Sequence, residues 1–151
     1  MDDVQFWTAV HGAARKAGRA YLATVEGGQP RVRVVFPAFE GRALWIATKP
    51  GSPKARQTRR DPRVELFFEV GAKRPTVHLT VTGVARFVDA AAEKARVWNA
   101  KLFGYDLGEF WPEGPGSKDF SLVLITPHRV ELGTQPAMWK GQAPEVWKED
   151  G

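Results

Sequence analysis

The sequence predicts a mainly β (α+β) domain in which six antiparallel strands form a small closed barrel with peripheral helices. Short segments that alternate apolar and polar residues recur along the chain, and turns containing glycine or proline separate them. Only two or three segments have helical spacing. Since the chain has 151 residues, we expect a single domain over residues 1–151, with an irregular C-terminal tail from about residue 133.

The first element is an amphipathic helix over residues 4–17. Its apolar residues recur at helical spacing: Phe6, Trp7, Val10, Ala13, Ala14 and Ala17. Residues 20–26 alternate as in a strand, and the turn at residues 27–30 leads into a hairpin partner over residues 31–39. Pro37 in this partner indicates a bulge or an edge strand, because proline has no N–H to donate to a neighbouring strand.

A strand, a tight turn and a short helix come next. The apolar run over residues 43–48 has strand composition and ends at Thr48. Ser52 then caps a helix with Pro53 in its first turn, where the missing N–H costs nothing. Asp61 ends the helix, because a residue that precedes proline avoids helical backbone angles.

The start of this short helix is a candidate phosphate site. Free backbone N–H groups and the positive end of the helix dipole collect just after Ser52, and Lys54 and Arg56 lie alongside. The alternative is a capped surface helix whose charges are solvated. Spacing alone does not decide between the two, because many capped helices hold no ligand.

The second half of the chain continues the β pattern. We expect strands over residues 63–69, 76–88 and 120–132, a helix over residues 90–102 capped by Asp89, and an aromatic-rich loop over residues 103–116. Residues 76–88 have the clearest two-residue period. One face carries Val77, Leu79, Val81, Ala85 and Phe87, and the other carries Thr76, His78, Thr80, Thr82 and Arg86. Residues 122–125 are apolar on both faces, which indicates burial or an interface.

Three observations favour a homodimer: the doubly apolar strand, the aperiodic aromatic tail and a count of six tryptophans. Tryptophan needs burial or a partner surface. The alternative is that the tail, with Trp139 and Trp147, packs on its own barrel. Because a small barrel fills its interior with side chains, a ligand would bind at the rim or at a dimer interface.

Composition excludes several kinds of site. The chain has no cysteine, which excludes disulfides, thiolate metal ligands and cysteine nucleophiles. His11, His78 and His128 have no second ligand at metal-binding spacing, so we expect no metal. No apolar segment is long enough to span or target a membrane, so we expect a cytoplasmic protein without membrane contact.

The net charge of +5 is concentrated between Lys49 and Arg63. Such a basic cluster leaves nucleic-acid binding as an alternative function. We expect no nucleic acid to bind, because aromatic residues are not interleaved with these charges and no element is long enough to lie along a groove.

Two segments resemble the signature of the pyridoxamine-phosphate-oxidase-like flavoproteins: TKPGSPKARQ at residues 48–57 and DPRVELFF at residues 61–68. Residues 110–114 and 122–132 are similar to the general stress protein branch of that family. The resemblance implies an FMN-binding split barrel that forms a homodimer, with the flavin held at the subunit interface. FMN is the implied cofactor, and a deazaflavin or FAD is an alternative.

The resemblance also implies which residues contact the cofactor. They are Arg33, Val34 and Val35 near the flavin ring and phosphate, Thr48, Ser52 and Lys54 at the phosphate and ribityl chain, and His78, where the family often carries a glutamine facing the flavin. Taken without the family, Arg33 belongs to the polar outer face of a half-exposed strand. From their own chemistry, Trp111 and Trp139 are candidates to cover a planar ligand, although core filling is the commoner role of such residues.

Two departures from the family pattern bear on the substrate. Pro53 replaces an arginine that holds phosphate, and Ala38 replaces a lysine found in the true oxidases. The C-terminal Arg and His pattern of the oxidases is also missing. We therefore expect a protein that is not a pyridoxamine phosphate oxidase.

The expected function is a flavin-dependent oxidoreductase that moves electrons from a reduced nicotinamide or similar donor to a small-molecule acceptor. No residue is assigned as catalytic, because the cofactor carries that chemistry. The alternatives are a non-catalytic flavin-binding stress-response protein and a deazaflavin-dependent reductase.

Overall fold

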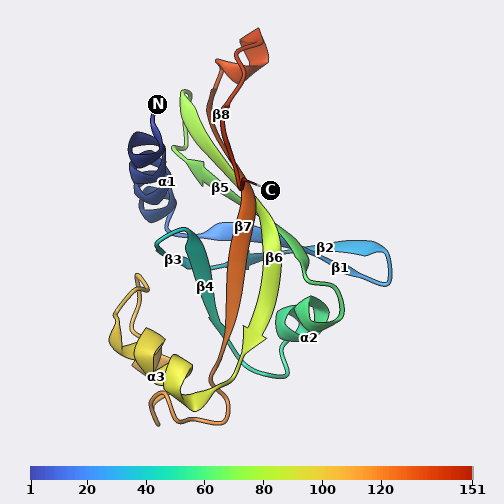
Figure 1. Cartoon of the computed structure of the whole chain (residues 1–151), viewed down its shortest axis with the longest axis vertical. Helices are drawn as coiled ribbons and strands as arrows, with labels where there is room; N and C mark the ends of the chain where they lie inside the picture. Colours follow the sequence, from blue (N-terminus) through green and yellow to red (C-terminus); the bar gives the residue numbers. More distant parts are fainter. Residues whose placement is uncertain (151) are drawn as a thin grey trace.

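One antiparallel β-sheet forms the body of the protein (Figure 1). The computed structural model describes residues 1–150, and the strand order is β2-β1-β5-β6-β7-β4-β3, with β8 paired to β7. The strands are β1 (Ala20–Glu26), β2 (Gln29–Val35), β3 (Ala38–Glu40), β4 (Ala43–Thr48), β5 (Arg63–Val70), β6 (Thr76–Val88), β7 (Ser121–Gln135) and β8 (Glu145–Lys148). The helices are α1 (Asp3–Ala17), α2 (Pro53–Arg60), α3 (Ala91–Asn99) and two short 3-10 helices, η1 (Leu107–Glu109) and η2 (Met138–Lys140). The predicted mainly β class is confirmed.

The sheet curls into a barrel that is split between β2 and β3. These two strands lie at opposite ends of the sheet order, yet only Phe36 and Pro37 separate them in the chain. Since each step between Cα atoms spans about 3.8 Å, the two ends of the sheet must lie close together. No backbone pairing joins β2 to β3 within residues 1–150. The closed barrel expected from the strand pattern alone is therefore wrong, whereas the split barrel that the family resemblance implies is confirmed, with eight strands rather than six.

The predicted strands over residues 20–26, 43–48 and 76–88 are confirmed at both ends. The β1–β2 turn holds Gly27 at φ 56° and Gly28 at φ 80°. Two successive left-handed residues match the twist of a tight hairpin, and glycine adopts them without steric cost. The predicted strand over residues 31–39 instead divides into β2 and β3, because the chain breaks at Pro37.

Two predictions for the second half of the chain are wrong. Asp89 does not cap α3, which begins after Ala90 and ends at Asn99. The Asp89 carboxylate instead accepts hydrogen bonds from Lys94 Nζ at 3.1 Å and from Ser121 Oγ at 2.9 Å. The tail also contains the strand β8, which pairs with β7 over residues 129–132.

Two hydrophobic clusters lie on either side of the sheet. The first, between α1 and the sheet, includes Val123 and Ile125 of β7. The second, beneath α3 and the aromatic loop, includes Leu122 of the same strand. Burial within one chain thus accounts for the doubly apolar segment of β7.

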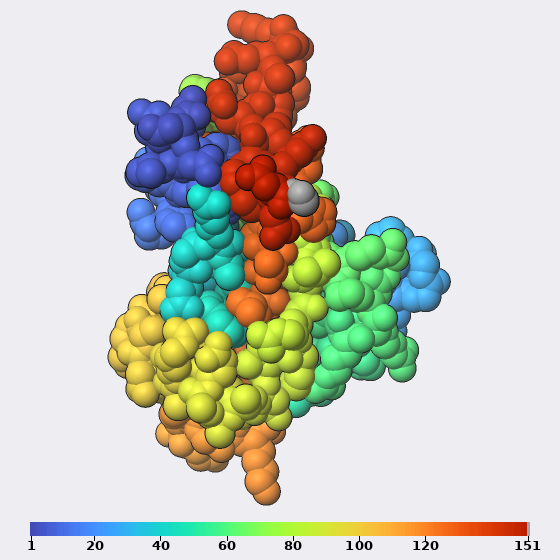
Figure 2. All heavy atoms as spheres, viewed as in Figure 1, coloured from blue at the N-terminus to red at the C-terminus, as the bar shows by residue number. Residues whose placement is uncertain are grey.

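The tail packs partly on its own barrel. The Trp147 ring in β8 lies 5.1 Å from the Trp7 ring in α1, between ring centroids. Figure 2 shows the rest of this C-terminal segment projecting beyond the body of the molecule, while α2 lies beside the β1–β2 hairpin. Within residues 1–150, no helix is long and apolar enough to cross a membrane.

Candidate functional site

The first turn of α2 gathers hydroxyl groups and one cation. Ser52 caps the helix, and its Oγ accepts a hydrogen bond from the Ala55 N–H at 3.2 Å. Thr48, the last residue of β4, lies 2.7 Å from Ser52 between hydroxyl oxygens. Lys54 Nζ donates to Thr48 Oγ1 at 3.2 Å. The predicted cap is confirmed, and Thr48, Ser52 and Lys54 lie together.

Arg33 of β2 reaches the same helix from the inner face of the sheet. It lies opposite Leu22 of β1, a fully buried core residue, so the prediction that Arg33 belongs to a polar outer face is wrong. Arg33 Nη2 donates to Gln57 Oε1 of α2 at 2.6 Å. Arg33 Nη1 is buried and has no hydrogen-bond partner among residues 1–150.

Two half-buried cations therefore lie near one another. Burial lowers the pKa of Lys54 below the usual value of lysine, and the positive charge of Arg33 lowers this pKa further. Burial is also the main cause that lowers the pKa of Arg33, with a smaller contribution from Arg31. Within residues 1–150, neither Lys54 nor Arg33 forms an ion pair with a carboxylate. Their positive charge is thus available to an anion.

Gln57, for which the sequence predicted no role, connects α2 to the first hairpin. Its side chain is buried at 4% exposure. Gln57 Oε1 accepts from Thr24 Oγ1 at 2.7 Å, and its Nε2 donates to Glu26 Oε2 at 2.6 Å. The signal in the sequence is a polar residue one helical turn after Lys54, on the same face of a short helix.

An open cavity of about 740 Å³ adjoins the start of α2. Its wall is formed by Ala47, Thr48, Lys49, Pro50, Gly51, Ser52, Lys54, Phe110, Trp111, Lys118 and Asp119. Trp111 is buried, and its Nε1 donates to the Asp119 carbonyl at 2.8 Å. Trp111 therefore lies beside the site but is held as a core residue, while the neighbouring Phe110 is exposed.

The other four predicted cofactor residues are Val34, Val35, His78 and Trp139. Val35, in the same strand as Arg33, is buried in the core, whereas Val34 lies on the outer face of the sheet. His78 of β6 shares that outer face, and its Nε2 lies 3.0 Å from Glu69 Oε2. Trp139 lies in η2, where it is exposed and contacts the Arg74 guanidinium.

Members of the basic cluster between Lys49 and Arg63 have different surroundings. Arg63 forms an ion pair with Asp61 at 2.6 Å, and the Arg59 guanidinium lies 3.7 Å from the centroid of the Phe87 ring. Lys54 is the member of this cluster that contacts the hydroxyl groups at the start of α2.

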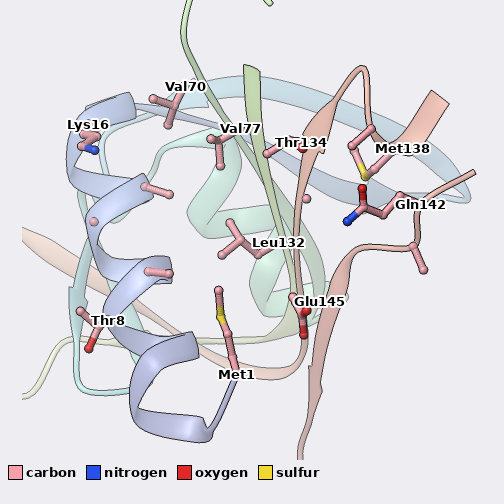
Figure 3. A pocket seen from close by; sticks show the side chains of 16 residues that line it. Met1, Thr8, Lys16, Val70, Val77, Leu132, Thr134, Met138, Gln142 and Glu145 are labelled. Carbon is pink, nitrogen blue, oxygen red and sulfur yellow. The ribbon is translucent and has the colours of Figure 1, made fainter. Parts of the chain in front are cut away.

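A second cavity, of about 540 Å³, lies between α1 and the β7–η2–β8 segment (Figure 3). Leu132 and Val77 line its floor, and Met138 and Gln142 lie across it from α1. None of the predicted cofactor residues lines this cavity. Among residues 1–150, no three His, Asp or Glu side chains are grouped as metal ligands.

Comparison with known proteins supports the fold and identifies relatives. A family model described as pyridoxamine 5′-phosphate oxidase matches residues 6–132. General stress protein 26 of Bacillus subtilis (strain 168) is 24% identical over 112 residues, which cover 74% of this chain and 76% of that protein.

Solved structures share the fold. The crystal structure of general stress protein 26 from Bacillus anthracis (strain Sterne) has a TM-score of 0.73 at 19% identity, with 96% of this chain and 99% of that chain covered. A heme binding protein from Mycobacterium smegmatis has a TM-score of 0.70 at 18% identity, with 90% of this chain and 55% of that chain covered. At these identities the likeness shows a common fold.

Proposed function

The chain belongs to the pyridoxamine 5′-phosphate oxidase family, which includes flavin-binding proteins, and on this premise we propose that it binds FMN and acts as a flavin-dependent oxidoreductase. One observation carries the proposal. Arg33 and Lys54 are half-buried cations that form no ion pair among residues 1–150; Lys54 lies at the capped start of α2, and Arg33 is bonded to Gln57 of the same helix. Such an environment suits a phosphate group.

The donors of the site fit a phosphate group in number and kind. A buried polar atom without a partner is costly, and Arg33 Nη1 is such an atom. A phosphate oxygen would supply its acceptor. Lys54 would add a point charge, and the hydroxyl groups of Thr48 and Ser52 would complete the set.

Pro53 and Ala38, the two departures from the family pattern, bear on which ligand the protein binds. Pro53 has neither a backbone N–H nor a polar side chain, so the phosphate would depend on Arg33 and Lys54. Ala38 is buried at 8% exposure, and no cation takes its place on β3. The residues present are therefore better suited to binding a flavin than to binding the substrate of the true oxidases.

When bound, FMN would accept a hydride from a reduced nicotinamide or similar donor and pass electrons to a small acceptor. The residues of this chain would hold the phosphate, orient the ribityl chain through Thr48 and Ser52, and shape the cavity beside Trp111. A deazaflavin or FAD carries a phosphate group too, so the same residues would serve a reductase that uses either one.

We further propose that the protein is a homodimer with the flavin at the subunit interface. Tyr21, Val32 and Val34 form an exposed apolar patch on the outer face of β1 and β2. Exposed apolar patches mark interaction surfaces. A second chain would bring its own copies of Val34, His78 and Trp139 towards the site, which would explain why these residues lie apart from α2 within one chain.

The test is an absorbance spectrum of the purified protein after FMN is added and the excess is removed by gel filtration. We expect an oxidised-flavin spectrum at about one flavin per chain, as a single site per chain requires. Riboflavin, which lacks the phosphate, is the control and should be lost during filtration. Loss of FMN to the same extent would overturn the proposal.

Oxidation of a reduced nicotinamide by the FMN-loaded protein then separates an enzyme from a flavin-binding stress-response protein. We expect the donor to bleach the flavin spectrum under anaerobic conditions, and oxygen or another acceptor to restore it. A spectrum that no nicotinamide donor changes would favour the non-catalytic alternative.

A further inference from the structure

We propose that Gln57 is a positioning residue for the phosphate site, where it holds the Arg33 guanidinium beside Lys54 without neutralising its charge. This inference rests on the proposed function, because it concerns the same site. It assigns roles to the buried amide of Gln57 and to the Glu26 carboxylate, which accepts a hydrogen bond from that amide.

The hydrogen bonds determine how the Gln57 amide is oriented. The Glu26 carboxylate accepts hydrogen bonds and does not donate them, so the Gln57 NH₂ group faces Glu26 Oε2 at 2.6 Å. Gln57 Oε1 must then point the other way. There it accepts from Arg33 Nη2 at 2.6 Å and from Thr24 Oγ1 at 2.7 Å.

The Gln57 amide is important because it carries no charge. A carboxylate in contact with Arg33 would form an ion pair and cancel the charge that attracts a phosphate. The amide oxygen of Gln57 accepts the same hydrogen bond without forming an ion pair with the guanidinium. Glu26, whose carboxylate accepts from the Gln57 amide, lies 3.9 Å from Arg31 Nε, and its charge raises the pKa of Arg33 less than burial lowers it.

The spacing on α2 brings the two cations together. Lys54 and Gln57 are one turn apart, at positions i and i+3, and so share one face of the helix. A guanidinium held by Gln57 is thereby held next to Lys54, and the positive charge of Arg33 lowers the pKa of Lys54. Nη1, the second terminal nitrogen of Arg33, is buried and has no hydrogen-bond partner among residues 1–150.

The test measures the affinities of wild-type protein and variants for FMN and for riboflavin by flavin fluorescence, together with the melting temperature. Gln57→Met keeps the length of the side chain and removes both amide groups. We expect FMN to bind about tenfold more weakly, the effect of losing one oriented charge-assisted contact, while riboflavin affinity changes by less than about twofold. A merely structural role would lower both affinities together.

A double-mutant cycle gives the second readout. In an Arg33→Met background, Gln57→Met should have no further effect on FMN affinity, because Gln57 acts through Arg33. Thr58→Val is the matched control, since Thr58 is buried on the same helix and bonds only to carbonyls of α2. It should change the melting temperature and leave the ratio of FMN to riboflavin affinity unchanged.

The outcomes separate the two proposals. Equal losses of FMN affinity for Gln57→Met with and without Arg33 would overturn the positioning role while leaving FMN binding intact. If the wild type binds no FMN, the proposed function fails, and inorganic phosphate becomes the probe. Phosphate should then raise the melting temperature of the wild type and not that of Gln57→Met, and equal shifts would overturn the inference.

Discussion

Cations that are partly withdrawn from water and lack a carboxylate partner need another anion to offset the cost of burial. Arg33 and Lys54 are two such groups, and both contact α2 or its cap: Lys54 bonds to Thr48 beside the cap, and Arg33 bonds to Gln57 in the second turn. Ser52 and Lys54 could be predicted from local spacing around a helix cap, and Thr48 and Arg33 from the family resemblance. Gln57 could not, because its partners come from β1 and β2, which are distant in the chain.

The first prediction concerns the two cations themselves. Lys54→Met and Arg33→Met should each weaken FMN binding by about 1–3 kcal/mol, the usual value of a lost charge-assisted contact. Riboflavin affinity should stay unchanged, since riboflavin has no phosphate. Isothermal titration with both ligands measures this.

Arg60→Met serves as the control for these variants. It removes one positive charge from the exposed last turn of α2, away from the site, and should alter FMN affinity little. An Arg60 effect as large as the Lys54 effect would show that the net charge, rather than this site, attracts the phosphate.

The second prediction is a pH dependence that Lys54 produces. Burial, and then Arg33, lower the pKa of Lys54, so its positive charge is lost as the pH rises through a value below the usual 10.5. The ratio of FMN to riboflavin affinity should fall on that alkaline side, and also below about pH 6, where the phosphate gains a proton. Both ligands carry the same flavin ring, so titration of the ring changes both affinities alike and cancels in their ratio.

Fluorescence titrations at a series of pH values measure this profile. In Lys54→Met the acid limb should persist and the alkaline limb should disappear. An alkaline limb that is unchanged in the variant would assign the titration to another group.

At the scale of the elements, local patterns predict those elements whose limits are set by nearby residues. β1, β4, α2 and β6 fall in this group, because glycine, proline or a capping serine marks their ends. β8 and the end of α3 were not predicted, since β8 exists only through pairing with β7. Asp89 was assigned as a cap because its residue type favours that position, but Lys94 and Ser121 engage its carboxylate.

A third prediction concerns the long β6–β7 pair, which changes register between Thr82 and Gly83. A Cβ atom at Gly83 would lie 2.4 Å from the Thr126 carbonyl oxygen, which belongs to the backbone and cannot rotate away. Gly83→Ala should therefore reduce the free energy of unfolding by about 1–3 kcal/mol, as measured by urea denaturation.

Gly12→Ala is the contrasting variant. Gly12 lies within α1, and a Cβ atom there would have nothing within 4 Å. Alanine should raise the free energy of unfolding by about 0.5–1 kcal/mol, because glycine loses more backbone entropy in a helix. If the two variants changed the free energy of unfolding in the same direction, the close approach of the Thr126 carbonyl would not explain why Gly83 is needed at the β6–β7 bulge.

At the scale of the whole molecule, the strand pattern predicts the β class, and the family resemblance, not the pattern, predicts that the barrel is split. Closure depends on whether the first and last strands of the sheet pair, and no local pattern reports this. The chain turns at Phe36 and Pro37 from one end of the sheet to the other, which leaves the barrel split there. The same arrangement places Arg33 inside the sheet and Val32 and Val34 on its outer face.

The fourth prediction tests the proposed homodimer through this outer face. Val32 is 67% exposed on an apolar patch, so Val32→Asp should place a charge in the interface and shift the protein from dimer to monomer. Val4→Asp is the control, because Val4 is 76% exposed on α1, outside the patch. Light scattering coupled to gel filtration measures both masses, and a monomeric wild type would contradict the proposal.

The most direct test of the central claim is a crystal structure of the protein with FMN. We expect the phosphate to lie at the start of α2, with its oxygens at hydrogen-bond distance from Lys54 Nζ and Arg33 Nη1, and with Gln57 still bonded to Arg33 Nη2. An FMN phosphate in the cavity between α1 and η2, or bound anywhere without contact to Lys54 and Arg33, would contradict it.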